Sequence, residues 1–311
     1  MDILSLLIVN LIPLYIIIAL GFIAGRKLDV ELPSIAAVVI YVIAPVVNFG
    51  AMVQLEFNVD YIALPVILFC FSGLLGIAVY VLAQRAFQNT TANLIAMSSV
   101  TGNTGYFGLP LVLTFFDAKY AGLYLFMNMA VLLNESGLGY YLGARGHADI
   151  KGAVIKVLKL PVVHAIWLGL LVNALNINLP DIMIKYWHYA TGTWVILGMM
   201  IIGIALSKQR RLQIDARLLT WLFIPRFILW PLAGWGIIMA DALIFQVYDS
   251  TLYQMIAIFT AVPLAGNLVA YASTLNLHPE RAAASVLLST FLALVSVSTN
   301  LLLVRHVFGL N

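Results

Sequence analysis

Two short segments combine glycine or proline with amide side chains inside otherwise apolar stretches. The first holds Gly102, Asn103 and Thr104, and the second holds Pro263, Gly266 and Asn267. Glycine weakens a helix by ~1 kcal/mol and proline by ~3 kcal/mol relative to alanine. Backbone groups freed in a bilayer cost several kcal/mol each unless protein or a water-lined cavity satisfies them. Each segment is therefore either a close-packing face or a break in a helix, and the amide side chains favour a break.

A break at each segment predicts a site for a small charged ligand. New helices would start near Asn103 and Asn267, and their free amide groups and positive dipole ends attract anions. Two such starts facing each other would bind a carboxylate without any Lys or Arg. The freed carbonyl groups, together with side-chain oxygens of Asn103, Thr104 and Asn267, would equally suit Na⁺. The sequence leaves these two uses open.

Ionisable side chains within the apolar stretches need an explanation, because each costs ~2.5–3.5 kcal/mol near the bilayer centre. Glu135 and Arg226 lie about eight and nine residues from the ends of their stretches, at a depth of roughly 12 Å, so they could pair. Glu135 is predicted to lie inside protein, within reach of Arg226 or of a polar residue at a break. Asn128 precedes Glu135 by two helical turns and shares its face. This group is either a site for a coupling H⁺ or Na⁺, a structural ion pair, or a carboxyl that faces a cytoplasmic vestibule.

Other polar and aromatic residues give weaker signals. Asn48 follows Pro45 by three residues, and it either faces the broken segments and their ligand or makes a helix–helix hydrogen bond worth ~0.6 kcal/mol. The six tryptophans, Trp194 among them, fit interface belts and packing. The single cysteine, Cys70, is predicted to be a small buried hydrophobe.

The elements that position these residues are membrane helices. Of the 311 residues, 63% are apolar and 9% are charged, whereas a soluble domain carries roughly 25% charged residues. A bilayer core needs ~20 apolar residues per helix. Ten runs approach or exceed that length: 3–25, 34–53, 61–83, 92–115, 121–142, 161–176, 182–206, 217–239, 252–274 and 282–304. The fold is therefore predicted to be all-α and membrane-embedded.

The basic residues predict the orientation. Twelve follow odd-numbered runs: Arg26, Lys27, Arg85, Arg145, Lys151, Lys156, Lys159, Lys208, Arg210, Arg211, Arg217 and Arg281. Only Lys119, Lys185 and Arg305 follow even-numbered runs or lie at a terminus. Because short cytoplasmic loops are rich in Lys and Arg, both termini are predicted to face outside.

The polar stretch 143–160 is predicted to link two halves, 1–150 and 151–311. Each half would hold five helices, and an odd number means that a duplicated half enters the membrane in the opposite orientation. Such inverted repeats are typical of secondary transporters, whose sites lie on broken helices near the midplane. Ten helices without internal symmetry are the alternative.

The run from Gly102 to Leu111 resembles the fourth-helix motif of the auxin efflux carrier family. Pro263 and Ala265, followed by the segment 276–280, are similar to its ninth helix and exit loop. The resemblance implies a scaffold of helices 1, 2, 6 and 7 and a moving unit of helices 3–5 and 8–10, with helices 4 and 9 crossing at their breaks. The chain looks like a bacterial member, because 143–160 is far shorter than the central loop of plant carriers. It has Gly102 where those carriers have proline and Leu264 where they often have glutamine, so substrate identity is not carried over.

These features predict a secondary carrier for a small organic anion in the bacterial cytoplasmic membrane. The chain has no P-loop, no HExxH motif, no Gly-x-Ser-x-Gly and no Cys/His cluster, which argues against an ATP-driven pump and an enzyme. No cofactor is expected beyond a coupling Na⁺ or H⁺, and no nucleic-acid partner, whereas a homodimer through scaffold helices is one option. The alternative function is a sodium-coupled organic-anion symporter of the bile-acid type, although the ninth run carries no carboxylate.

Overall fold

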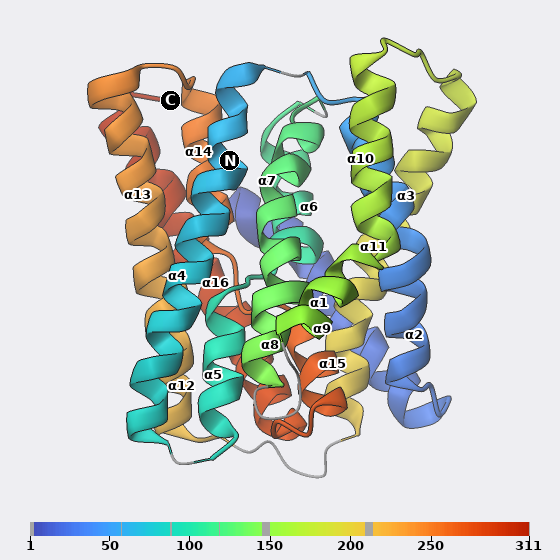
Figure 1. Ribbon diagram of the computed structural model, residues 1–311, viewed down its shortest axis with the longest axis vertical. Coiled ribbons are helices and arrows are strands. Elements are labelled where there is room, and N and C mark those ends of the chain that lie inside the picture. The colour runs from blue at the N-terminus through green and yellow to red at the C-terminus, as the bar shows by residue number, and fades with distance from the viewer. Residues whose placement is uncertain are drawn as a thin grey trace.

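The computed structural model describes residues 3–56, 58–87, 89–117, 119–144, 150–208 and 214–310, and all regular elements within these ranges are helices (Figure 1). In chain order they are α1 (Ile3–Lys27), α2 (Leu32–Val38), η1 (Val39–Ile43), α3 (Ala44–Val53), η2 (Val59–Ile62), α4 (Ala63–Ala86), α5 (Thr91–Ser99), η3 (Thr104–Gly108), α6 (Leu109–Phe115), α7 (Tyr120–Asn134), η4 (Glu135–Gly139), α8 (Tyr140–Gly143), α9 (Ile150–Leu158), α10 (Pro161–Ala174), α11 (Asp181–Ser207), α12 (Ala216–Ile224), η5 (Pro225–Leu229), α13 (Trp230–Ala240), η6 (Asp241–Phe245), α14 (Ser250–Ala261), α15 (Asn267–Thr274) and α16 (Pro279–Val307).

Each apolar run predicted from the sequence is mainly helical where the structure describes it, and the runs 92–115 and 252–274 each contain a non-helical interruption. Six of the resulting helices are long and apolar enough to cross a membrane. They are Val9–Lys27, Leu32–Val53, Val59–Ala86, Asp181–Ser207, Ala216–Phe245 and Pro279–Val307. The remaining runs form helices that are shorter, interrupted or more polar.

Wide π-helical turns occur where prolines or polar residues enter these helices. The π turn η1 ends just before Ala44 and Pro45, and η5 begins at Pro225. Proline lacks an amide donor and clashes with the preceding turn, and a π turn accommodates the displaced carbonyl group. Each such turn inserts an extra residue, so it rotates the side chains that follow relative to a regular α-helix.

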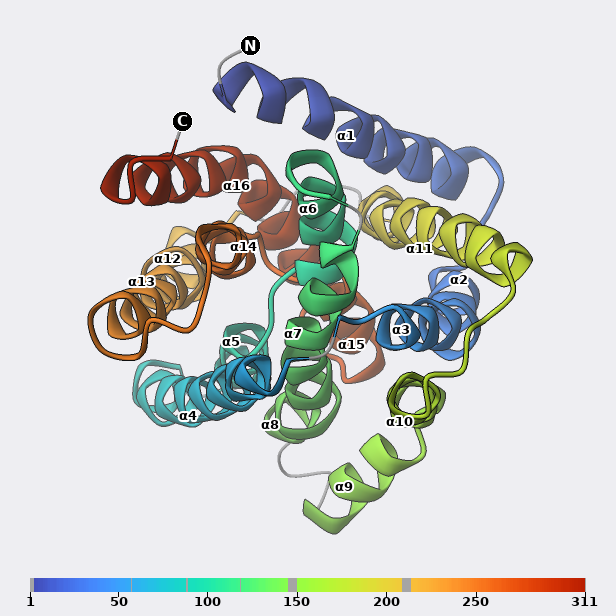
Figure 2. The ribbon, with the colours of Figure 1, turned by 90° about the horizontal axis from the view of Figure 1, so that it is seen from above.

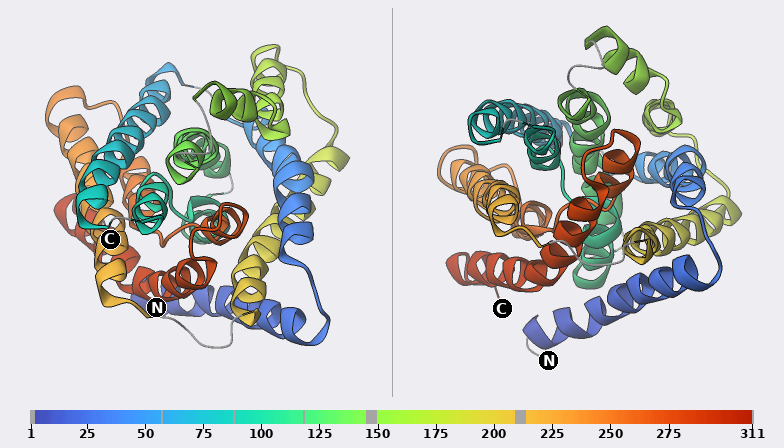
Figure 3. Two further views of the ribbon diagram at one scale, coloured as in Figure 1. Left: turned by 60° about the horizontal axis from the view of Figure 1, so that its bottom comes forward. Right: turned by 90° about the horizontal axis from the view of Figure 1, so that it is seen from below.

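The helices form packed groups on two sides of the molecule. The helix α1 lies along α11, and α3 lies along α10, on one side of the molecule (Figure 2). Glycines allow α1 and α11 to approach each other closely. A Cβ on Gly21 would meet the backbone of α11, and a Cβ on Gly203 would meet the backbone of α1. On the other side α4 packs on α5 and α7, and α14 packs on α13 and α16. Seen from below, the red segment that includes α15 and the start of α16 crosses the middle of the molecule (Figure 3).

Where the structure describes them, the ends of the odd-numbered runs that lead into the basic connections lie at one end of the molecule, the bottom in Figure 1. Lys208 lies 3.7 Å from Asp29, and Arg281 lies 3.5 Å from Asp215. Arg217 also donates a 2.8 Å hydrogen bond from Nη2 to the carbonyl of Ala86. These contacts join loops that are far apart in the sequence. Three basic residues of the predicted set lie outside the described residues: Arg145, Arg210 and Arg211.

Within the stretch 143–160, residues 150–158 form the helix α9, which packs on η4. One expectation needs correction. Cys70 is exposed rather than buried, because it lies on the outer face of α4. A membrane helix is apolar all round, so its composition does not tell which face is buried.

Candidate functional site

The run at 92–115 is interrupted where the sequence predicts a break. The helix α5 ends at Ser99, residues 101–103 are not helical, and η3 begins at Thr104. The carbonyl of Asn103 then accepts hydrogen bonds from the amides of Phe107 and Gly108, at 3.3 and 3.1 Å, which starts the second half of the run. Gly102 leaves room at the break for the guanidinium of Arg226, which a Cβ at this position would displace.

The run at 252–274 is interrupted in a similar way. The helix α14 ends at Ala261, and Val262 is extended with ψ 161°, as expected for a residue before proline. The amide of Leu264 donates a 3.1 Å hydrogen bond to Ser289 Oγ on α16, so this freed donor is satisfied inside the protein. The helix α15 starts at Asn267. Both predicted interruptions are therefore present.

The two interruptions touch each other. The amide of Asn103 donates a 2.8 Å hydrogen bond to the carbonyl of Pro263. The backbone amide of Asn103 is therefore not free for a ligand, because that donor joins the two breaks. The amides that follow Asn103 belong to the first turn of a helix, where N–H groups have no intrahelical acceptor.

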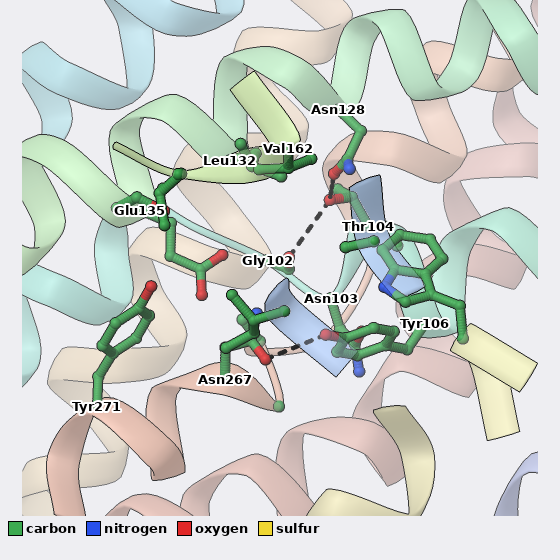
Figure 4. Close-up of a pocket in the computed structure, with 18 residues that line it drawn as sticks. Gly102, Asn103, Thr104, Tyr106, Asn128, Leu132, Glu135, Val162, Asn267 and Tyr271 are labelled. Carbon is green, nitrogen blue, oxygen red and sulfur yellow. Dashed lines mark hydrogen bonds between the residues drawn. The ribbon is translucent and has the colours of Figure 1, made fainter. Parts of the chain in front are cut away.

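A cavity of about 60 Å³, lined by both polar and apolar side chains, lies beside this contact (Figure 4). Seven of the predicted residues line it: Gly102, Asn103, Thr104, Asn128, Glu135, Gly266 and Asn267. They come from η3, α7, η4 and α15 and from the segments that precede η3 and α15. Ile40 and Ala44 line it from η1 and α3, and Trp194 lines it from α11. The cavity thus lies between the two interrupted runs on one side and η1, α3 and α11 on the other.

Hydrogen bonds fix several of the lining side chains. The hydroxyl of Thr104 donates to Asn128 Oδ1 at 2.5 Å, and the hydroxyl of Thr101 donates to Glu135 Oε2 at 3.2 Å. On the opposite wall, the hydroxyl of Tyr106 donates to Asn267 Oδ1 at 3.2 Å. Figure 4 shows the Glu135 carboxylate pointing towards Asn267 and Tyr271. The predicted placement of Glu135 inside protein is confirmed, since its side chain is only 8% exposed.

Three polar atoms of the lining residues are buried without a hydrogen-bond partner in the described part of the chain. They are Asn103 Oδ1, Glu135 Oε1 and Trp194 Nε1. Leaving a buried donor or acceptor unsatisfied costs ~1–3 kcal/mol, and more for a charged group. Unpaired groups that surround a cavity are satisfied when a ligand, ion or water enters it.

Arg226 does not pair with Glu135, so of the two predicted kinds of neighbour Glu135 has the polar residue at the break, Thr101. The guanidinium of Arg226 donates to the carbonyls of Thr101, Phe259 and Thr260, at 3.4, 3.3 and 2.8 Å. These carbonyls lie at or near the C-terminal ends of α5 and α14, where the helix dipole is negative. The guanidinium also lies 4.9 Å from the ring centroid of Trp230. Arg226 therefore holds the first halves of both interrupted runs together, and it does not line the cavity.

Two further candidates also lie outside the cavity lining. Asn48 is fully buried on α3, one turn beyond Ala44, and its Nδ2 donates a 2.9 Å hydrogen bond to the carbonyl of Ala44. Its Oδ1 has no partner in the described residues. Pro263 contributes through its carbonyl, which binds the Asn103 amide, rather than by lining the cavity.

One face of α11 packs against the first interruption, and the sequence did not predict this contact. The rings of Trp194 and Tyr106 meet edge to face with centroids 5.0 Å apart. A Cβ on Gly105 would meet the Trp194 ring, and a Cβ on Gly198 would meet the Tyr106 ring. Glycine spacing near an aromatic residue is a weak signal, because only the packing of α11 on η3 shows which rings the glycines admit.

The cavity lining favours oxygen ligands over a transition-metal site. In the described residues no three His, Cys, Asp or Glu side chains are grouped so that they could hold a metal ion. The lining does offer carboxylate, amide and hydroxyl oxygens from Glu135, Asn128 and Thr104.

An all-helical chain with several apolar spans and a partly polar cavity at two helix interruptions has the features of a membrane transporter. Comparison with known families agrees: residues 6–135 and 149–300 match the model of the family described as Membrane transport protein. The chain belongs to this auxin efflux carrier-like family, so the resemblance seen in the sequence is confirmed. It is also similar to an uncharacterized transporter from Methanocaldococcus jannaschii, with 26% identity over 181 residues. That match covers 55% of this chain and 59% of the relative.

Proposed function

We propose that this protein is a secondary transporter that moves a small organic anion across the cytoplasmic membrane of a bacterium. In this proposal residues 1–150 and 151–311 are inverted five-helix repeats. The scaffold consists of α1–α3, α10 and α11, and the moving unit consists of the helices from α4 to α8 and from α12 to α16. The moving unit would carry the cavity across the membrane in an elevator-like step.

The observation that carries the proposal is the partly polar cavity at the joined interruptions. Among the described residues its lining has no Lys or Arg, and it takes polar groups from both interrupted runs. The starts of η3 and α15 place positive dipole ends near it, which favours an anion. A water needs at least ~10–15 Å³ of such a volume, so about 60 Å³ suits an occupant of only a few heavy atoms.

Glu135 then provides a physical reason for coupling. A substrate carboxylate and an ionised Glu135 in one small cavity would repel each other strongly, because charges interact more strongly inside a protein than in water. A proton on Glu135, or a cation beside it, removes this repulsion. We therefore propose that the anion and one H⁺ occupy the cavity together.

Sodium coupling is the second candidate, and a specific observation favours it. Asn103 Oδ1 and Glu135 Oε1 are unpaired buried acceptors, and Asn128 and Thr104 add further oxygens to the same lining. Na⁺ held by these oxygens would also neutralise Glu135. The protein would then be a symporter of the bile-acid type.

The remaining parts of the proposal concern orientation and assembly. The basic connections would face the cytoplasm and both termini the outside, by the positive-inside rule. A homodimer would form through scaffold helices in the lipid bilayer. Cysteine accessibility of single-cysteine variants in intact cells tests the orientation, and cross-linking in membranes tests the dimer.

Uptake by proteoliposomes tests the transport proposal. Purified protein is reconstituted, and uptake of radiolabelled two- to four-carbon carboxylates is measured with an imposed pH gradient, an Na⁺ gradient or neither. We expect uptake to rise as the external pH falls, because the neutral fraction of Glu135 rises. The variant Glu135→Gln should lose this pH dependence, whereas the control Glu280→Gln, an exposed residue at the start of α16, should keep it. Stimulation by Na⁺ alone would instead favour the symporter, and no uptake of any carboxylate would refute the anion.

A further inference from the structure

We propose that the indole N–H of Trp194 is the donor by which the scaffold recognises the carboxylate of the transported anion. This inference rests on the proposed function, because it assigns a contact within the same cavity. It also makes Trp194 a determinant of specificity, since an N–H donor binds an anion and cannot coordinate a cation.

The first observation is an unpaired donor in a closed position. Trp194 lines the cavity from α11 and is only 4% exposed. Its Nε1 is closed off from solvent and has no acceptor in the described residues. Buried tryptophan N–H groups nearly always find an acceptor, so this one is expected to find it in the ligand.

Other tryptophans of the same chain show what an ordinary structural indole looks like here. Trp187 donates to the carbonyl of Val47 at 2.8 Å, and Trp230 donates to the carbonyl of Ser99 at 2.9 Å. Trp235 donates to Asn300 Oδ1 at 3.1 Å. Trp194 differs from all three, and it is also the tryptophan that lines the cavity.

The second observation is that packing fixes the Trp194 ring. The edge-to-face contact with Tyr106 and the absence of room for a Cβ on Gly105 hold the indole against η3. The ring therefore cannot turn to seek another acceptor without displacing Tyr106, whose hydroxyl is bonded to Asn267. Because Nε1 is closed off from solvent, an incoming acceptor reaches this donor when a neighbouring lining side chain shifts, while the indole itself stays in place.

The occupant must then accept a hydrogen bond from Trp194 Nε1. Glu135 Oε1, an acceptor on η4 that is unpaired among the described residues, needs a proton or a hydrogen-bond donor. A carboxylate bound together with one H⁺ meets both needs. Trp194 lies on α11 of the proposed scaffold, and Glu135 lies on η4 of the proposed moving unit. The two residues would therefore bind the substrate from opposite sides of the boundary between these two units.

The test compares Trp194→Phe with Trp187→Phe in purified full-length protein. Binding of acetate, lactate and succinate is measured by thermal stabilisation and by the ligand-induced change in tryptophan fluorescence. Trp194→Phe keeps an aromatic ring but removes the donor together with the five-membered part of the indole, so we expect at least about a tenfold loss of affinity, the scale of a hydrogen bond to a charged group. Its melting temperature without ligand should fall, because the smaller ring leaves a void in a buried position.

Trp187→Phe is the matched control, because it removes the same atoms from another buried tryptophan. It also strands the carbonyl of Val47, so it should lower the melting temperature and leave the affinity unchanged. If Trp194→Phe folds poorly, Trp194→His, which keeps a ring N–H, should retain more affinity than Trp194→Leu at equal protein levels. Wild-type affinity in Trp194→Phe, or equal affinity in the His and Leu variants, would overturn the role of Trp194 alone. Absence of carboxylate binding by the wild type would instead overturn the anion proposal.

Discussion

The substitution Gly198→Ala tests whether the packing of α11 on the first interruption is as close as described. A Cβ at position 198 would overlap the ring of Tyr106, which is buried and packed on Trp194. The ring has to shift, and its hydroxyl then leaves Asn267. We therefore expect losses of both stability and substrate affinity.

The magnitude follows from three contributions. Overpacking a buried contact costs ~1–3 kcal/mol, and the lost hydrogen bond costs ~1 kcal/mol. Replacing glycine by alanine in a helix gains ~1 kcal/mol. The net loss of folding stability is therefore about 1–3 kcal/mol by these principles.

Gly192→Ala is the matched control on the same helix, because a Cβ at Gly192 meets nothing within 4 Å. That variant should gain up to ~1 kcal/mol, so the two variants should differ by roughly 2–4 kcal/mol. Thermal unfolding in one detergent, with carboxylate affinity measured alongside, checks both values. Equal melting temperatures and equal affinities for the two variants would refute the described packing.

Two related predictions concern the guanidinium that joins the interrupted runs. Arg226→Met should lower the folding stability by roughly 3 kcal/mol or more, since it leaves the carbonyls of Thr101, Phe259 and Thr260 without a donor, at ~1–3 kcal/mol each. Arg226→Lys should recover part of this loss in a thermal unfolding assay. Gly102→Ala should destabilise the protein less than Arg226→Met, because the guanidinium has to move but keeps some acceptors. A melting temperature of Arg226→Met equal to that of the wild type would contradict the predictions for Arg226 and for Gly102.

Helix interruptions could be predicted from the sequence because their causes are local. Pro263 forces Val262 out of the helical region, and the segment from Gly102 to Thr104 combines low helix propensity with side chains that compete for backbone groups. The residues around these breaks therefore line the cavity as a group.

Partners across helices could not be predicted in the same way. The depths of Glu135 and Arg226 were counted along regular helices, yet Glu135 begins the π turn η4 and Arg226 lies within the π turn η5. A π turn rotates the helix face, so equal depth does not imply that two side chains meet. Which wall each one faces depends on tertiary packing: Arg226 reaches the helix ends, and Glu135 reaches the cavity.

Trp194 shows another limit of the sequence. A tryptophan in an apolar run resembles every other belt or packing tryptophan, and no neighbouring residue marks it as different. Only the placement of α11 against η3 shows that its N–H lacks an acceptor at the edge of the cavity.

Binding of a carboxylate to the double variant Asn103→Ala, Asn267→Ala tests the central claim most directly. The claim is that a small organic anion binds in the cavity where the interrupted runs meet, with these two amides as its nearest side-chain donors. Each single variant should weaken binding by roughly 1–2 kcal/mol, or about 5–30-fold, and the double variant by more. The measurement is a direct binding titration on purified protein that is as folded as the wild type. Wild-type affinity in the double variant, or a substrate that proves to be a cation, would contradict the account.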